Sequence, residues 1–231
     1  MKKLFVLFVM QLISYSAWSQ TMNIHYKNGQ TVEYNMDNID YVEFTEKKEN
    51  NTQVSSEKAV DLGLSVKWAS CNVGATSPEQ YGDKYAWGET ETKDNYTKDN
   101  YIYYNAETMV YTFLGNDISG TEFDAARKVW GGKWRMPTYD EMYELRMKCE
   151  WEWTRFNNKN GFKATGPNGN SIFIPIEERT GYWSSTMNDI TTESNANALL
   201  ILFDYSISPK NYAKTSTERR IGWYIRPVIS E

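Results

Sequence analysis

Hydrophobic and polar residues alternate near the start of the chain, on both sides of Asn28-Gly29. Ile24 precedes this pair and Val32 follows it, each between polar neighbours. Asn-Gly tolerates the positive φ angles of a tight turn, so the pattern predicts a β-hairpin. Ile39–Phe44 continues the alternation as a third short strand. A unit this small buries little apolar surface, so we expect it to dock on another surface.

A polar stretch at residues 47–57 lacks hydrophobic periodicity and is interpreted as a linker. It separates a hairpin module, residues 20–46, from a main domain, residues 58–231. Short apolar runs in the main domain alternate with Gly, Asn, Asp and Ser, a pattern typical of short strands. The predicted strands are residues 64–70, 84–87, 161–165, 171–175, 181–186, 198–204 and 223–228.

Two short helices are predicted between these strands. Thr121–Val129 begins with a Thr-x-x-Asp pattern and stops at Gly131-Gly132. The second helix follows Pro137, with Thr138 as N-cap and Glu141 at the third helical position, which forms a capping box. An apolar stripe would direct the second helix toward the core, and its members are Met142, Leu145 and Cys149. Helices followed by a meander of strands indicate an α+β fold.

The first nineteen residues have the pattern of a signal peptide. Lys2 and Lys3 precede the apolar run Leu4–Ile13, and Ala17-Trp18-Ser19 places small residues at a cleavage site. The run rises only about 15 Å as a helix, too short to span a bilayer. Cleavage would remove two lysines and no acid, taking the net charge from −5 to −7. We therefore expect a secreted, cell-surface or periplasmic protein without a membrane span, the alternative being an uncleaved anchor.

Charge and composition exclude several classes of function. The net charge is −5 and the basic residues form no cluster, which argues against a nucleic-acid partner. The one histidine, His25, lies in the hairpin module, so the main domain lacks histidine-based catalysis and histidine-based zinc sites. No GxxxxGK[ST] or GxGxxG pattern occurs. With 30 acidic residues, a carboxylate pair for glycoside hydrolysis carries little information.

Export changes the interpretation of Cys71 and Cys149, the two cysteines of the chain. In an oxidising compartment, two cysteines without CxxC spacing or a metal-site pattern most often pair. We predict a Cys71–Cys149 disulfide, and the alternative is two separate buried thiols.

Two loop segments are candidates for ligand binding. Tyr101, Tyr103 and Tyr104, together with Tyr96, are interleaved with Asn and Asp and suit a stacking platform for sugar or peptide. The alternative is a long loop packed on its own side chains. A second loop is dense in oxygen ligands, with the candidate residues Asn188, Asp189, Glu193, Asn195 and Asn197. Asp189 and Glu193 make it a weak calcium candidate, the alternative being a solvated turn.

Other residues are assigned structural roles. Tryptophans at core-like spacing are expected to be buried: Trp68, Trp134, Trp151, Trp153 and Trp183. Arg135 and Arg226 are expected to bind buried backbone or acids, whereas Arg219-Arg220 is expected to be exposed. Pro137, Thr138 and Glu141 form the helix start described above.

Several sequence blocks of the main domain stand out in a fixed order: Val60–Glu89, Trp130–Leu145, Cys149–Trp153, Gly161–Pro175 and Gly222–Val228. Together they resemble the Fibrobacter succinogenes major paralogous domain family, over residues 58–231. The Trp-Arg-Met-Pro-Thr block and the Arg-Pro ending are also similar to the wider C-type-lectin-like superfamily, which includes formylglycine-generating enzymes. The resemblance implies a compact mixed fold with its termini close together, long loops, few helices and no established activity. No cysteine follows Cys149, so the late cysteine pair of those enzymes does not carry over.

These observations together favour an exported, non-catalytic binding or adhesion module. The expected ligand is a glycan or an extracellular protein, recognised by the loops at residues 95–104 and 188–197. No cofactor is expected apart from a possible calcium ion. One alternative is a structural or assembly subunit whose hairpin module docks on other surface proteins, and a further alternative is a glycan-active enzyme.

Overall fold

The computed structural model describes residues 21–25, 30–35, 37, 59–177, 179–188, 196–211 and 213–230. The chain divides into two compact units, Met1–Glu49 and Asn50–Glu231. In the first unit, β1 (Thr21–His25) pairs antiparallel with β2 (Thr31–Asn35), with Ile24 opposite Val32. The predicted hairpin is therefore confirmed. Its turn, the predicted third strand, the signal peptide and the linker lie outside the described residues.

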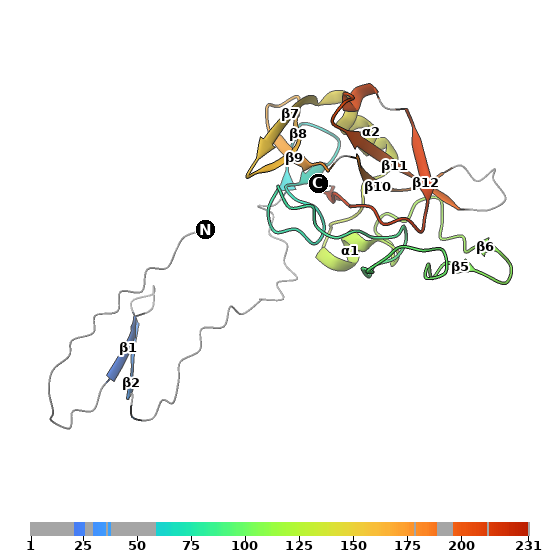
Figure 1. Cartoon of the computed structure of the whole chain (residues 1–231). Helices are drawn as coiled ribbons and strands as arrows, with labels where there is room; N and C mark the ends of the chain where they lie inside the picture. Colours follow the sequence, from blue (N-terminus) through green and yellow to red (C-terminus); the bar gives the residue numbers. More distant parts are fainter. Residues whose placement is uncertain are drawn as a thin grey trace. The chain divides into compact units, whose positions relative to one another are not determined.

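The second unit is strand-rich, with two short α-helices, and its strand pairs are antiparallel (Figure 1). This is consistent with the α+β class. Its helical elements are α1 (Ala125–Trp130), α2 (Tyr139–Lys148) and a 3-10 turn, η3 (Pro209–Asn211). Its strands are β3 (Ala59–Val60), β4 (Lys67–Ala69), β5 (Tyr104–Asn105), β6 (Val110–Tyr111), β7 (Glu150–Phe156), β8 (Lys159–Thr165), β9 (Ser171–Pro175), β10 (Arg179–Met187), β11 (Asn197–Asp204), β12 (Thr215–Glu218) and β13 (Val228–Ile229).

The strands form small sheets in the orders β7-β8-β9, β10-β11-β12, β13-β4-β3 and β5-β6. In the third of these, β4 pairs with β3 on one side and with β13 on the other. The first and last strands of the unit thus flank one strand, which brings the two ends of the domain together. Arg226 links sheets, because its buried guanidinium donates to the carbonyls of Ala69 in β4 (3.0 Å) and Phe173 in β9 (2.9 Å).

The core lies on both faces of the β10–β11 pair. Because side chains alternate along a strand, neighbouring residues enter different layers. Tyr182 and Ile201 pack with α2 and β8-β9, whereas Trp183 and Leu200 pack with Trp87 on the other face. Trp68, Trp134 and Trp183 are buried as predicted. Trp153 is 41% exposed and Trp151 is only partly buried, so the core prediction is wrong for Trp153.

The second helix follows its prediction closely. Thr138 and Glu141 form the capping box, and Met142, Leu145 and Cys149 are buried. Arg135 makes a two-pronged ion pair with Glu141, at 2.6 and 2.8 Å. The first helix differs from the prediction, because α1 begins at Ala125. The carboxylate of Asp124 accepts from the N–H groups of Arg127, Gly120 and Met136, which fixes a non-helical turn before it.

The predicted Cys71–Cys149 disulfide is wrong, because both cysteines are free and buried. Cys71 packs with Trp130 and Trp134, and its thiol donates to the carbonyl of Ala75 at 3.4 Å. Cys149 ends α2 in the separate core layer of Met142 and Leu145. Burial raises the pKa of the Cys149 thiol to about 11. The alternative of two separate thiols therefore holds.

The strand predictions need several corrections. The strand predicted at residues 223–228 is reduced to Val228 in β13 and to isolated bridges at Trp223 and Tyr224, and β12 was not predicted. Residues 84–87 form no strand and contribute one bridge, between Tyr85 and Trp223. The strand predicted at residues 64–70 is reduced to β4. Conversely, β7 was missed, since the predicted strands resume only at residue 161. No helix among the described residues is long and apolar enough to cross a membrane.

Candidate functional site

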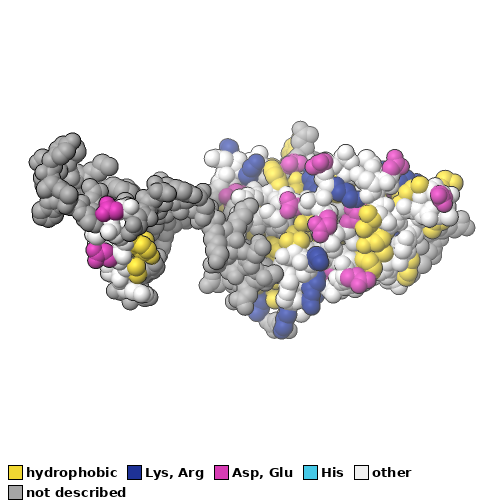
Figure 2. Space-filling view, turned by 90° about the horizontal axis from the view of Figure 1, so that it is seen from below, with side chains coloured by type: hydrophobic (Ala, Val, Ile, Leu, Met, Phe, Trp, Pro, Cys, Tyr) yellow, Lys and Arg dark blue, Asp and Glu magenta, His cyan; other side chains and the backbone are white. Residues whose placement is uncertain are grey.

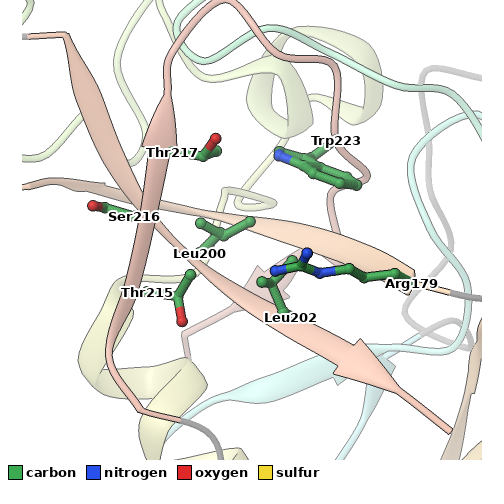
Figure 3. Close-up of a pocket in the computed structure, with 7 residues that line it drawn as sticks. All are labelled: Arg179, Leu200, Leu202, Thr215, Ser216, Thr217 and Trp223. Atoms are coloured by element: carbon green, nitrogen blue, oxygen red, sulfur yellow. The ribbon is translucent and has the colours of Figure 1, made fainter.

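A pocket of about 200 Å³ lies over one face of the β10-β11-β12 sheet (Figure 3). We call it the Trp223 pocket, and its lining residues are Arg179, Leu200, Leu202, Thr215, Ser216, Thr217 and Trp223. The sticks in Figure 3 show the Trp223 ring on one side, the β12 hydroxyl residues on the other and the two leucines between them.

Strand register explains why these side chains share one face. Leu200 of β11 stands opposite Trp183 of β10 and Thr215 of β12. Directly opposed residues in antiparallel strands project to the same side, and so do residues two apart. Arg179 lies four positions before Trp183 and Thr217 lies two after Thr215, so both project to the pocket face. Ser216, between Thr215 and Thr217, projects to the other face, where its hydroxyl accepts from the side-chain amide of Asn188 at 3.1 Å, so it only borders the pocket.

The Trp223 ring is held against the sheet by close packing on Gly181. A Cβ added to Gly181 would stand 2.5 Å from Cδ2 of Trp223 and 2.9 Å from Cδ1 of Leu200. Glycine is therefore the residue that lets the indole lie this close to β10. The backbone of Trp223 is fixed as well, because it exchanges two hydrogen bonds with Tyr85, at 2.9 and 3.1 Å.

The pocket combines an apolar floor, an aromatic wall and hydrogen-bonding groups. Leu200 and Leu202 are buried, Trp223 and the β12 residues are half-buried, and Arg179 is exposed. Among the described residues, neither the Arg179 guanidinium nor the Trp223 indole N–H has a hydrogen-bond acceptor. The indole N–H is itself buried, so the lining offers the Arg179 guanidinium and the β12 hydroxyls beside an apolar surface, which is the composition of small-molecule sites.

A carboxylate stands at the edge of this face. Asp204 is directly opposite Arg179 in the β10–β11 register. Hydrogen bonds from the Ser206 hydroxyl and N–H hold the pKa of Asp204 below its usual range, and the Arg179 charge acts in the same direction. The exposed end of the pocket thus carries a guanidinium whose nearest strand partner is an ionised acid.

The predicted tyrosine platform is wrong at Tyr101. Its side chain is only 2% exposed, and its hydroxyl donates to the carbonyl of Trp87 at 2.7 Å. Tyr103 packs edge-on against Phe123, and Tyr104 packs against Tyr111 with ring centroids 4.9 Å apart. The loop is therefore packed on its own side chains, the alternative that the sequence left open. Its exposed side chains are mainly polar, and they include one aliphatic residue, Ile102, at 68%.

An unexpectedly buried cation from a distant part of the chain binds this segment. Arg219 is 0% exposed, so the expected exposure of this residue is wrong. Its Nε donates to the Tyr101 hydroxyl at 3.0 Å and its Nη1 donates to the Thr112 carbonyl at 2.9 Å. Its guanidinium carbon lies 4.9 Å from the ring centroid of Trp87. We call Arg219, Trp87, Tyr101 and Tyr111 the Arg219 cluster.

Figure 2 shows hydrophobic side chains (yellow) at the surface on the side of α1 and the β5–β6 hairpin.

The second candidate loop is described only in part. Asn188 lies at the end of β10 and binds Ser216, which places it beside the Trp223 pocket. Asp189, Glu193 and Asn195 lie outside the described residues, so the calcium candidate stays a prediction. Within the described ranges, no three His, Cys, Asp or Glu side chains are grouped to hold a metal ion.

Sequence reasoning missed Arg179, Trp223 and the β12 threonines as site residues. The local sequence gives little signal, because Thr215, Ser216 and Thr217 are β-compatible hydroxyl residues without apolar–polar alternation. Arg179 and Trp223 join that face only through the register of separate strands. The chain matches no protein-family model, and neither a curated protein nor a solved structure is significantly similar to it.

Proposed function

We propose that this chain is an exported, non-catalytic binding module that recognises a glycan through the Trp223 pocket. The observation that carries the proposal is the half-buried Trp223 ring facing Thr215 and Thr217 across an apolar floor, with Arg179 at the open end. A sugar ring has an apolar C–H face that packs on an indole and hydroxyls that bind guanidinium and hydroxyl groups.

The size of the pocket narrows the ligand class. At about 200 Å³ it is smaller than the roughly 300–1,000 Å³ of sites for drug-sized ligands. A single sugar ring, at the end or at a branch of a glycan, is the unit that fits such a volume. Rings, hydroxyls and a guanidinium suit recognition, and the proposal assigns no residue to catalysis.

The finer fold assignment and the export of the chain belong to the same proposal. We assign the second unit to the C-type-lectin-like type, in agreement with the resemblance of its sequence blocks. The flanking of β4 by β3 and β13 supports this, as does the small helical content, two short α-helices among many short strands. Export rests on the signal-peptide pattern of residues 1–19.

A glycan-array screen of the mature protein, run with and without calcium, tests the proposal, followed by calorimetry on the ligands found. Trp223→Ala should abolish measurable binding, and Arg179→Ala should weaken it about tenfold, as for loss of one hydrogen bond to a charged group. Trp153→Ala is the matched control, since it removes a partly exposed tryptophan outside the pocket and should leave the Kd unchanged. Binding that survives Trp223→Ala would refute the proposed site.

A further inference from the structure

Strand β7 is an edge strand of its sheet. It pairs with β8 on one side in the order β7-β8-β9, and Figure 1 shows this sheet at the margin of the domain. No described residue outside β8 hydrogen-bonds to the β7 backbone. An edge of this kind presents a row of N–H and C=O groups that can template another strand.

The hairpin geometry identifies which backbone groups point outward. Asn157 and Asn158 form a two-residue turn with φ angles of 43° and 66°, flanked by the pair Phe156 and Lys159. In such hairpins the flanking pair exchanges two hydrogen bonds, and every second pair after it does the same. The residues in between therefore turn their N–H and C=O groups away from β8, and they are Trp151, Trp153 and Arg155.

An independent contact agrees with this assignment of inward-facing and outward-facing residues. If Lys159 and Gly161 face β7, the backbone groups of Asn160 must face β9. The N–H of Ile176, just after β9, donates to the carbonyl of Asn160 at 3.0 Å. The outward assignment of β7 therefore agrees with the opposite side of the sheet.

The other edge of the sheet is covered, and this makes β7 distinctive. The outward carbonyls of Phe173 and Pro175 in β9 accept from Arg226 at 2.9 Å and from the Tyr182 hydroxyl at 3.0 Å. Around β7, apolar side chains are instead exposed. They are Trp153 (41%) and Phe156 (42%) in β7, and Tyr205 (62%) beside Trp153. Trp153 and Tyr205 contact each other, with ring centroids 6.2 Å apart.

We propose that β7 is a self-association edge at which a second copy of this chain pairs antiparallel, with Trp153 opposite the same residue of the second copy. Only outward-facing residues can exchange hydrogen bonds across such an edge. In this register Trp151 stands opposite Arg155, an aromatic–cation pair, and the pair is repeated by symmetry. Glu152 stands opposite Thr154, so no like charges meet.

Charge repulsion disfavours the register in which the second copy is shifted so that Trp151 opposes Trp153. Sliding the second copy so that Trp151 opposes Trp153 would place Glu152 directly opposite the second Glu152, which is unfavourable. The centred register also forms the longest ladder, since the whole of β7 is paired and all three outward residues find outward counterparts. The exposed Trp153 and Tyr205 rings then become buried at the centre of the contact.

Sedimentation velocity of the mature chain over a hundredfold concentration range tests the proposal. We expect the mass to rise from one chain to two. Arg155→Pro removes an outward N–H without removing a bond to β8 and should weaken dimerisation at least tenfold. Arg155→Lys, the matched control, keeps both the N–H and the charge and should retain the dimer. Trp153→Glu provides a second disruption by placing two like charges opposite each other.

Hydrogen exchange supplies a readout that does not depend on any variant. The amides of Trp153 and Arg155 should gain protection as concentration rises, while that of Thr154, already bonded to β8, should not change. A chain that stays monomeric at every concentration overturns the proposal. So does a dimer that both Arg155→Pro and Trp153→Glu leave intact. Protection of β7 only by an added foreign peptide would also overturn it, because the occupant would then be another strand.

Discussion

Two arginines of the same domain lie beside aromatic rings, yet Arg219 is fully buried and Arg179 is exposed to solvent. Arg219 is 0% exposed, and its guanidinium binds the Tyr101 hydroxyl and the Thr112 carbonyl beneath the ring of Trp87. Arg179 is exposed beside Trp223, and within the described chain its guanidinium has no hydrogen-bond acceptor. The residue types are alike, so composition does not distinguish a scaffold from a recognition surface.

The difference lies in whether the protein itself supplies the hydrogen-bond partners. A buried guanidinium must be bound by protein groups, because desolvation without partners is costly. The Arg219 cluster provides them and so holds the segment from Trp87 to Thr112 in place. In the Trp223 pocket, by contrast, no described residue binds the exposed guanidinium of Arg179. The first arrangement should therefore govern stability, and the second should govern binding.

Arg219→Ala is the change with the largest expected effect on this comparison. It removes the charged hydrogen bonds to Tyr101 and Thr112, leaves the Thr112 carbonyl without this donor and opens a cavity beside Trp87. We expect the free energy of unfolding to fall by about 3 kcal/mol, measured by urea titration. Arg179→Ala should change it by less than ~0.5 kcal/mol, as at most surface sites. Equal effects of the two changes would contradict the division into scaffold and recognition surface.

Gly181→Ala should lower both the stability of the fold and the affinity for glycan, because Gly181 packs directly against the pocket residues Trp223 and Leu200. Its Cβ would meet the Trp223 ring at 2.5 Å, and overpacking of this kind typically costs about 1–3 kcal/mol. Glycan binding should be lost because the indole must move. The double variant Gly181→Ala/Trp223→Ala removes the clash, so its stability loss should be smaller than the sum of the two single losses. Additive losses would show that Gly181 does not position Trp223.

The parts of the fold that the sequence predicted are those set by neighbouring residues. The Thr138–Glu141 capping box depends on residues three positions apart, and the burial of Met142 and Leu145 depends on helical periodicity. The first hairpin likewise depends on an alternation around one turn. Each of these signals lies within a few residues of the structure that it predicts.

Arg219 and Arg220 show why the rest could not be predicted. They are adjacent and chemically identical, yet Arg219 is buried, whereas Arg220 is half-buried and pairs with Glu218. The partners that bury Arg219 are Tyr101 and Thr112, which lie 118 and 107 positions away. The disulfide prediction failed for a related reason, since export indicates that cysteines can pair and says nothing of the distance between them. Cys71 and Cys149 lie in different apolar clusters.

Tyr101→Phe is the change with the smallest expected effect on stability, and it tests one contact of the Arg219 cluster. The variant loses the hydroxyl that donates to Trp87 and accepts from Arg219, and at pH 7 we expect the free energy of unfolding to fall by about 1 kcal/mol. Tyr205→Phe, at a 62% exposed side chain, is the control for loss of a hydroxyl and should change it by less than ~0.5 kcal/mol.

The pH dependence of the stability lost in Tyr101→Phe shows whether the Tyr101 hydroxyl is buried away from water. Burial raises the pKa of Tyr101 above its ordinary value, with Arg219 opposing the shift. A group whose pKa is raised by folding stabilises the fold fully below its unfolded pKa, here about 10, and that contribution is lost as the pH rises beyond it. The gap between wild type and Tyr101→Phe should therefore shrink in urea titrations above about pH 10. A gap that stays constant would mean that Tyr101 ionises as freely as an exposed tyrosine, and the Arg219 cluster would then not be closed to water.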